Sequence, residues 1–201
     1  EQIAGIGAIP EARGLIDQGR LGVLCETVAS VDKLKGTVDG ILSRFNKWPK
    51  GVDFPPCTVS LCVDSKGSLS GGENPFEVLH SILGRTEVWK LCLEGKLSFG
   101  LNCSTILGIE RFYKQLAVWD VLHGTNYVSL FGYVAPNAAS IEPREAETRW
   151  KEGLNVDKDP TVPGRLVELV KLGLVRTAGL CCGHGHCDHE KTAELLFDSP
   201  I

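Results

Sequence analysis

The segment 180–190, with sequence LCCGHGHCDHE, holds three cysteines and three histidines within nine residues. Thiolates and imidazoles are ligands that zinc prefers, and four of them in a tetrahedron complete a structural site. Two thiolates and two imidazoles at matched spacings of five, with glycines between them, predict a zinc site formed by Cys182, His184, Cys187 and His189. His186 is the reserve ligand, and Cys57 is the best distant substitute.

Two other interpretations of this segment stay open. Familiar structural zinc sites combine short-spaced ligand pairs from separated segments, whereas these candidates all lie in one stretch. Cys187 could instead form a disulfide or redox pair with a nearby thiol, or the segment could be a solvated tail without a specific metal.

The second chemical candidate is Cys103, within Asn102-Cys103-Ser104 and directly before a predicted long helix. Amide groups and the dipole at a helix N-terminus lower a thiol pKa, so Cys103 is the candidate nucleophile of a thiol (papain-like) hydrolase. A hydrolase also needs a base. His123 lies at the far end of the same helix, roughly 30 Å away at 1.5 Å per residue, which leaves His80 or the C-terminal histidines. The alternative is a buried cysteine beside a capping serine.

The composition narrows the function classes. The 201-residue chain is 43% hydrophobic with a net charge of −4, and its basic residues are scattered, so we expect neither nucleic-acid binding nor attachment to a membrane surface. No apolar run approaches the ~20 residues of a membrane span, and we expect no signal peptide.

The cysteines bear on the compartment. Four of the eight cysteines lie in apolar patterns typical of small buried side chains: Cys25, Cys62, Cys92 and Cys103. Such cysteines favour a reducing compartment and hence a cytoplasmic location. A secreted or precursor-derived protein stays open, because the chain begins with Glu1 and contains no methionine.

Apolar periodicity predicts the elements that must position these residues. A wide apolar stripe over 21–45 predicts one or two core-packed helices with a break near Gly36, and self-association through this segment is a minority interpretation. The remaining elements are a strand over 58–64, a helix over 75–83, a hairpin over 89–101, a helix over 104–121, a strand over 127–134, and helices over 143–152 and 165–175.

The hairpin implies antiparallel pairing, so the expected fold class is α+β: a small antiparallel sheet with flanking helices and a Cys/His-rich C-terminal loop. We expect a single domain over 1–201. It divides into a helical segment (1–50), an α+β core (51–135), and a charged linker, helix and Cys/His tail (136–201).

The leading functional hypothesis is a non-enzymatic zinc-binding protein whose metal-stabilised C-terminal region acts in protein–protein interaction. Its expected partners are another protein or a second copy of the chain. The alternatives are the Cys103 hydrolase and a structural subunit released from a precursor polyprotein.

Overall fold

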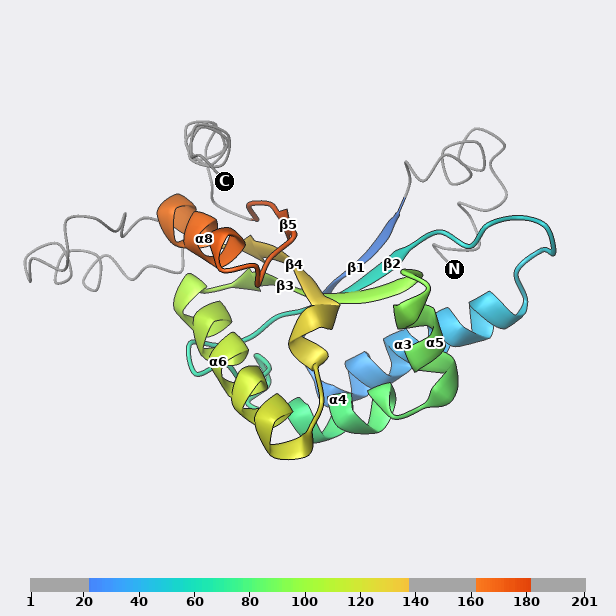
Figure 1. Cartoon of the computed structure of the whole chain (residues 1–201), viewed down its shortest axis with the longest axis horizontal. Helices are drawn as coiled ribbons and strands as arrows, with labels where there is room; N and C mark the ends of the chain where they lie inside the picture. Colours follow the sequence, from blue (N-terminus) through green and yellow to red (C-terminus); the bar gives the residue numbers. More distant parts are fainter. Residues whose placement is uncertain (1–21, 138–161, 182–201) are drawn as a thin grey trace, which may run out of the picture.

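Five short apolar segments form one parallel sheet in the computed structural model, which describes residues 22–137 and 162–181. The strands are β1 (Val23–Val28), β2 (Cys57–Leu61), β3 (Leu97–Ser104), β4 (Phe131–Pro136) and β5 (Thr177–Ala178). Their order in the sheet is their order in the chain, and all four neighbouring pairs are parallel (Figure 1).

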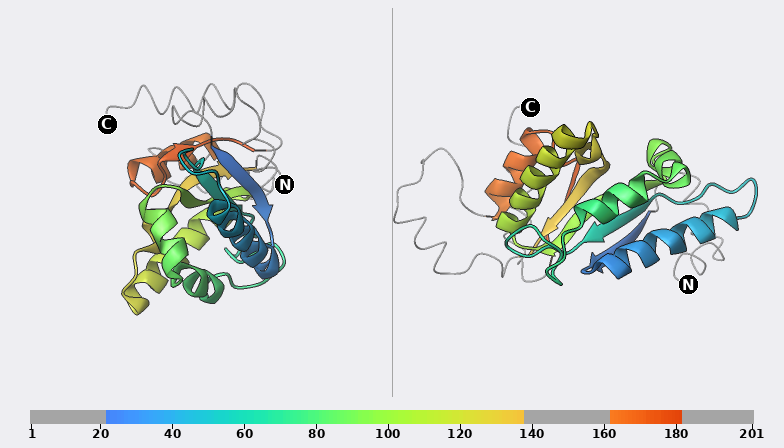
Figure 2. Two further views of the ribbon diagram at one scale, coloured as in Figure 1. Left: turned by 90° about the vertical axis from the view of Figure 1, so that its right-hand side faces the viewer. Right: turned by 90° about the horizontal axis from the view of Figure 1, so that it is seen from below.

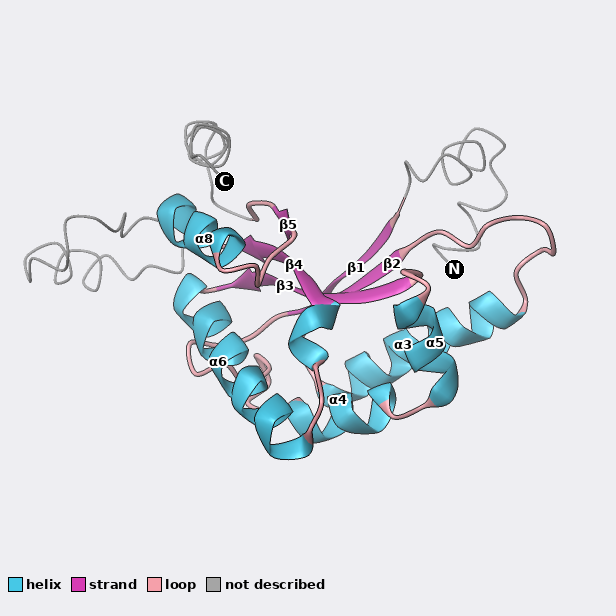
Figure 3. Cartoon of the chain, viewed as in Figure 1, coloured by secondary structure: helices cyan, strands magenta, loops and turns pink. Residues whose placement is uncertain are grey.

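Helices connect the strands and cover one face of the sheet. They are α3 (Val31–Asn46), α4 (Phe76–Leu83), α5 (Thr86–Leu93), α6 (Ile106–His123), the 3-10 turn η1 (Tyr127–Leu130) and α8 (Val162–Lys171). Crossovers between parallel strands are nearly always right-handed, so a sheet whose strand order never reverses has its helices on one side. Figures 2 and 3 show this arrangement, and no helix of the described residues lies on the opposite face.

The register of the strands builds the core beneath the helices. One row of paired residues runs across four strands through Cys25, Val59, Phe99 and Phe131, and a second row joins Leu61, Leu101 and Val134. All of these side chains except Cys25 are buried. The alternate residues of each strand point to the helix-free face, because successive side chains of a strand face opposite sides.

The predicted antiparallel hairpin over 89–101, and with it the α+β fold class, is wrong. Trp89, Leu91 and Leu93 belong to helix α5, which is only eight residues long, so alternate apolar residues mimic a strand there. Gly95, at φ 68°, follows the end of this helix and does not form a hairpin turn. β3 then pairs in parallel with β2 and β4, which makes the fold α/β.

The predicted helical segment 21–45 contains both a strand and a helix. Its first apolar residues form β1, and Ser30 then caps α3, accepting a hydrogen bond from Lys33 N at 3.3 Å. The helix continues without a break through Gly36 and buries its apolar stripe against the sheet: Leu34, Val38, Ile41 and Leu42.

Of the other elements predicted from the sequence, some are present and some begin or end at other residues. The helix expected over 104–121 is present as α6, capped by the Thr105 side chain. The strand expected over 127–134 begins only at Phe131, after η1, and the helix expected over 165–175 ends at Lys171. The predicted helix over 143–152 lies outside the described residues. Within residues 22–137 and 162–181, no helix combines the length and apolar character that crossing a membrane requires.

Candidate functional site

The carboxyl edge of the sheet gathers the polar chemistry of the fold. In parallel sheets of this kind the strands all end at the same edge, where active sites are usually found. The polar or thiol side chains at this edge include Glu26 on β1, Asn102 and Cys103 on β3, Tyr133 on β4, and Cys181 after β5.

Two cysteines far apart in sequence meet there. Cys103 Sγ lies 2.7 Å from Cys181 Sγ, and both residues are half-buried. The chain after β5 follows β4, since Gly179 N donates to Val134 O at 2.8 Å and Cys181 N to Pro136 O at 2.9 Å. This continuation of the ladder carries Cys181 across the end of β4 to Cys103.

The backbone at Cys103 leaves the strand conformation. Its φ is 49°, in the left-handed region, and the β3–β4 register shifts between Asn102 and Ser104. Non-glycine residues rarely adopt this conformation, and such strain is concentrated at functional sites. The irregularity occurs at the residue whose thiol contacts Cys181.

A third thiol lies close to this pair. Cys62 Sγ donates to Cys103 O at 3.3 Å, and Ser70 Oγ donates to Cys62 Sγ at 3.0 Å. Cys62 therefore supports the backbone of Cys103.

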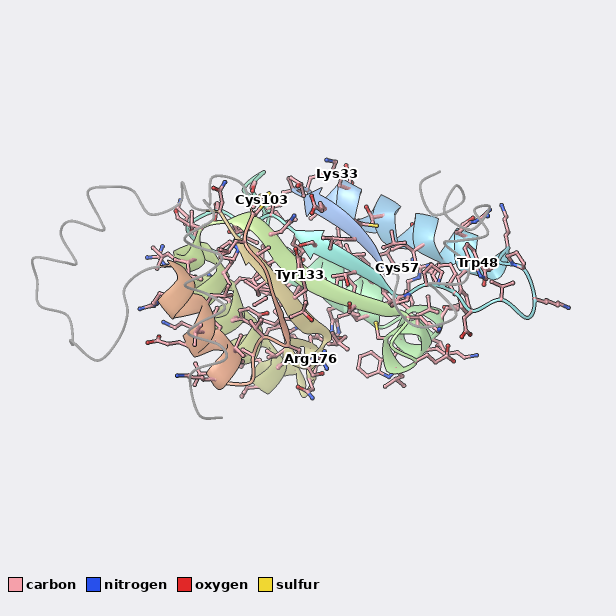
Figure 4. The ribbon with its side chains drawn as sticks, turned by 90° about the horizontal axis from the view of Figure 1, so that it is seen from above. Lys33, Trp48, Cys57, Cys103, Tyr133 and Arg176 are labelled. Atoms are coloured by element: carbon pink, nitrogen blue, oxygen red, sulfur yellow. The ribbon has the colours of Figure 1, made fainter. Side chains whose placement is uncertain are left out.

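The pKa of Tyr133 reflects the acidic groups around it. Burial raises the pKa of its phenol, and the nearby acidic groups of Glu26, Cys181 and Cys103 raise this pKa further. The phenol consequently stays protonated at neutral pH and can donate a hydrogen bond. In Figure 4 Tyr133 lies over the sheet and Cys103 near the end of β3, while Cys57 lies toward the opposite end.

The structure separates Cys57 from the other thiols of the site. Cys57 is the first residue of β2, is buried, and donates from Sγ to Pro55 O at 3.4 Å. Burial, with a smaller contribution from Cys25, raises the pKa of Cys57 to about 12. Cys57 is therefore not a partner for ligands at the carboxyl edge.

The predicted zinc ligands Cys182, His184, Cys187 and His189 lie outside the described residues, as does the reserve ligand His186. Among residues 22–137 and 162–181, no group of three side chains is arranged to hold a metal ion. Cys181, the first of the three cysteines in the segment 180–190, is the one member of the cluster that the structure describes, and it is paired with Cys103.

His80 and His123 lie away from Cys103, and the C-terminal histidines considered as bases lie outside the described residues. His80 Nδ1 is 2.8 Å from Tyr127 Oη, and the ring of His123 stacks on Trp119 with centroids 4.0 Å apart. Both belong to a cluster at the C-terminal end of α6, the end opposite to Cys103.

The sheet is parallel, its helices lie on one face, and a pair of thiols lies at its carboxyl edge. These features define the class of the protein: an α/β protein with the architecture of many enzymes. The family model of homocysteine S-methyltransferase matches residues 9–196, and the chain belongs to this family. No curated protein and no solved structure matches the chain. Domains of this family typically bind zinc.

Family membership corrects the functional hypotheses. A non-enzymatic zinc-binding interaction protein, a thiol hydrolase and a precursor-derived structural subunit are all wrong interpretations, because the family is one of methyltransferases. The zinc predicted from the C-terminal cluster agrees with the metal that domains of this family typically bind. Glu26 and Tyr133 were not predicted as site residues, because their place at one edge of the sheet depends on the parallel pairing of the strands.

Proposed function

We propose that this protein is a methyltransferase that methylates the thiol of homocysteine, with zinc held by Cys103, Cys181 and Cys182. The observation that carries this proposal is the Cys103–Cys181 pair at the carboxyl edge of the sheet. The match to the homocysteine S-methyltransferase family supplies the substrate class.

The donor set fits the metal. Zinc–sulfur bonds are about 2.3 Å long, so two sulfurs on one tetrahedral ion are roughly 3.8 Å apart. The 2.7 Å separation of Cys103 Sγ and Cys181 Sγ therefore brings both within reach of one ion. Cys182 follows Cys181 directly in the chain, which makes it our candidate for the third thiolate.

Three protein ligands suit a catalytic site better than a structural one, because the fourth position stays open for substrate. When bound, zinc would hold the homocysteine sulfur as a thiolate at neutral pH, since metal coordination removes the thiol proton. In the transfer, the homocysteine sulfur, its proton having passed to solvent, would form a bond to the methyl carbon of the donor. The bond between that carbon and its leaving atom would break, and the leaving atom would take the electron pair.

Glu26 is our candidate for the residue that holds the amino acid. Its exposed carboxylate raises the pKa of the Tyr133 phenol, as the thiols of Cys103 and Cys181 also do. All four groups therefore border one region. A carboxylate accepts hydrogen bonds from an α-ammonium group, and charge-assisted bonds of this kind are the strong ones. Glu26 would thus orient homocysteine with its thiol toward the cysteine pair.

The zinc ligand set predicted from the sequence shares only one residue with this one. Cys182 belongs to both sets, whereas His184, Cys187 and His189 belong only to the set within the tail. Zinc analysis of variants therefore separates them. Cys103→Ser and Cys181→Ser should each lower zinc well below one equivalent, whereas Cys187→Ser should retain it.

The activity is tested by methyl transfer to homocysteine from sulfonium, quaternary ammonium and N-methyl donors, with zinc-loaded protein. We expect methionine to form with one donor class, and Cys103→Ser to abolish its formation. Cys57→Ala is the matched control, because this thiol lies at the other end of the sheet and should leave methionine formation intact. Zinc binding without methionine formation from any donor class would overturn the proposal.

Two further predictions from the sequence stay proposals. A reducing, cytoplasmic compartment would suit a site that depends on thiolates. Self-association or binding to a protein partner is testable by sedimentation of the purified chain.

A further inference from the structure

The backbone of β1 is strained directly after Glu26. Thr27 has φ 58°, and the β1–β2 register shifts between Cys25 and Val28. Positive φ is rare for any residue except glycine, and for a β-branched residue such as threonine it is a genuine outlier. A strained conformation of this kind persists only where surrounding contacts enforce it.

One side chain supplies such a contact. Thr27 N donates to Asn102 Oδ1 at 3.2 Å, a hydrogen bond that joins β1 to β3 although β2 lies between them in the sheet. Asn102 is fully buried, and the next residue is Cys103, the other non-glycine residue with positive φ in the described chain. Asn102 therefore connects the two strained positions of the site.

The amide nitrogen of Asn102, Nδ2, indicates that the contribution of this residue to stability does not alone explain its presence. Since Oδ1 accepts from Thr27, Nδ2 is fixed as the remaining group, and it is buried without a hydrogen-bond partner. A buried unpaired donor is costly, and native structures keep few of them. An apolar side chain of the same size would avoid that cost, so a polar residue at this position needs a functional reason.

We propose that Asn102 is a positioning residue: it holds Thr27 in the left-handed conformation and thereby aims Glu26 at the Cys103–Cys181 pair. Because Cys103 follows Asn102 directly in β3, the same residue ties Thr27, and with it Glu26, to the strand that carries one of the thiols. The inference concerns the assigned role of Glu26 and so rests on the proposed function.

A double-mutant cycle isolates this role. Asn102→Ala removes the acceptor, and homocysteine binding to zinc-loaded protein, measured by calorimetry, should weaken about tenfold. Glycine adopts positive φ without strain, so Thr27→Gly makes the restraint less necessary. The loss caused by Asn102→Ala should therefore be clearly smaller in the Thr27→Gly background. An equal loss in both backgrounds would show that Asn102 acts only as a part of the core.

Hydrogen exchange gives a readout that needs no ligand. The amide of Thr27 should exchange faster in Asn102→Ala than in the unmodified chain, while Asn102→Asp, which keeps an acceptor oxygen, should preserve its protection. Ser98→Ala is the control, because it removes a 2.9 Å hydroxyl contact between β3 and Thr58 of β2 and should leave Thr27 unaffected.

The two proposals fail differently. If the unmodified zinc-loaded protein binds no homocysteine, the proposed function is wrong, and the exchange experiment still decides whether Asn102 restrains Thr27. If homocysteine binds but Asn102→Ala changes neither its affinity nor the exchange of Thr27, the positioning role is wrong and the proposed function stands.

Discussion

Gly100 on β3 lies against Tyr133 on β4 with no room for a methyl group between them. A Cβ atom at Gly100 would lie 2.7 Å from both Cδ1 and the carbonyl oxygen of Tyr133. Since one of these atoms belongs to the backbone, neither residue can yield without moving its strand. The absence of a side chain at Gly100 therefore lets Tyr133 lie close to β3, beside the cysteine pair.

We predict that Gly100→Ala lowers the free energy of unfolding by about 1–3 kcal/mol through overpacking. Denaturant titration would measure this loss. The control is Gly36→Ala in α3, where nothing lies within 4 Å of the added Cβ. There alanine should stabilise the helix by up to about 1 kcal/mol. Equal effects at the two glycines would contradict the prediction.

The ion pair between Glu110 and Arg165 should stabilise the packing of α6 against α8. Arg165 Nε donates to Glu110 Oε1 at 2.6 Å, and only 11% of the Glu110 side chain is exposed. Glu110→Gln should cost about 1.5–3 kcal/mol, because charge-assisted bonds out of water are strong. In contrast, Asp39→Asn breaks a pair with Arg85 whose side chains are 56% and 42% exposed, and should cost less than about 1 kcal/mol. Thermal unfolding of the two variants compares them directly.

Alkaline pH should destabilise the fold through two buried thiols. Burial raises the pKa of Cys57 and of Cys92 to about 12, from an ordinary value of 9.0. Above pH 9 the unfolded chain loses these protons first, so stability is complete below pH 9 and falls as pH rises toward 12. Each thiol contributes a slope of about 1.4 kcal/mol per pH unit. Unfolding titrations of the unmodified chain between pH 8 and 11 would measure it.

The variant Cys57→Ala should reduce that slope by one thiol's contribution. Val88→Ala serves as its control, because it removes buried atoms from α5 without removing an ionisable group. This control should lower stability by a similar amount at every pH. If Cys57→Ala left the slope unchanged, the thiol would not be the source of the alkaline loss.

Zinc retention should depend on pH in the opposite direction. Thiolate ligands must be deprotonated to bind the metal, so acidification should release zinc and binding should release protons. A chromophoric chelator would follow the release as pH is lowered from 8 to 5. The zinc that remains in Cys181→Ser, which has one thiolate fewer, should be released at a higher pH than the zinc of the unmodified chain. Release at the same pH in both proteins would place the metal elsewhere.

Sequence patterns predicted elements whose signals are local. The helix α6 follows from its periodicity, although its cap is Thr105, whose side chain accepts from Gly108 N at 2.8 Å, and not the serine that precedes it. Strand β1 was hidden, because its apolar residues join those of α3 into one continuous stripe across Ser30. The parallel pairing was missed for a related reason: α5 has so few residues that its apolar positions fit a strand as well as a helix.

Only part of the site could be predicted from the sequence. Cys103 could be predicted as a functional residue because it precedes a long helix, and Cys181 because it belongs to a Cys/His cluster. Their pairing joins residues 78 positions apart and depends on β3, β4 and β5 being parallel neighbours. No spacing rule predicts that contact. Glu26 lies in a short strand without a motif, so its place at the site emerges only from the fold.

The agreement between strand order and chain order also bears on how the protein forms. As the chain leaves the ribosome, each new strand from β2 to β5 finds its partner already synthesised, because that partner is the preceding strand. No strand between β1 and β5 has to wait for a later one before it can pair. The sheet can therefore grow during translation from its β1 side, and exposed strand edges that promote aggregation are covered soon after they appear.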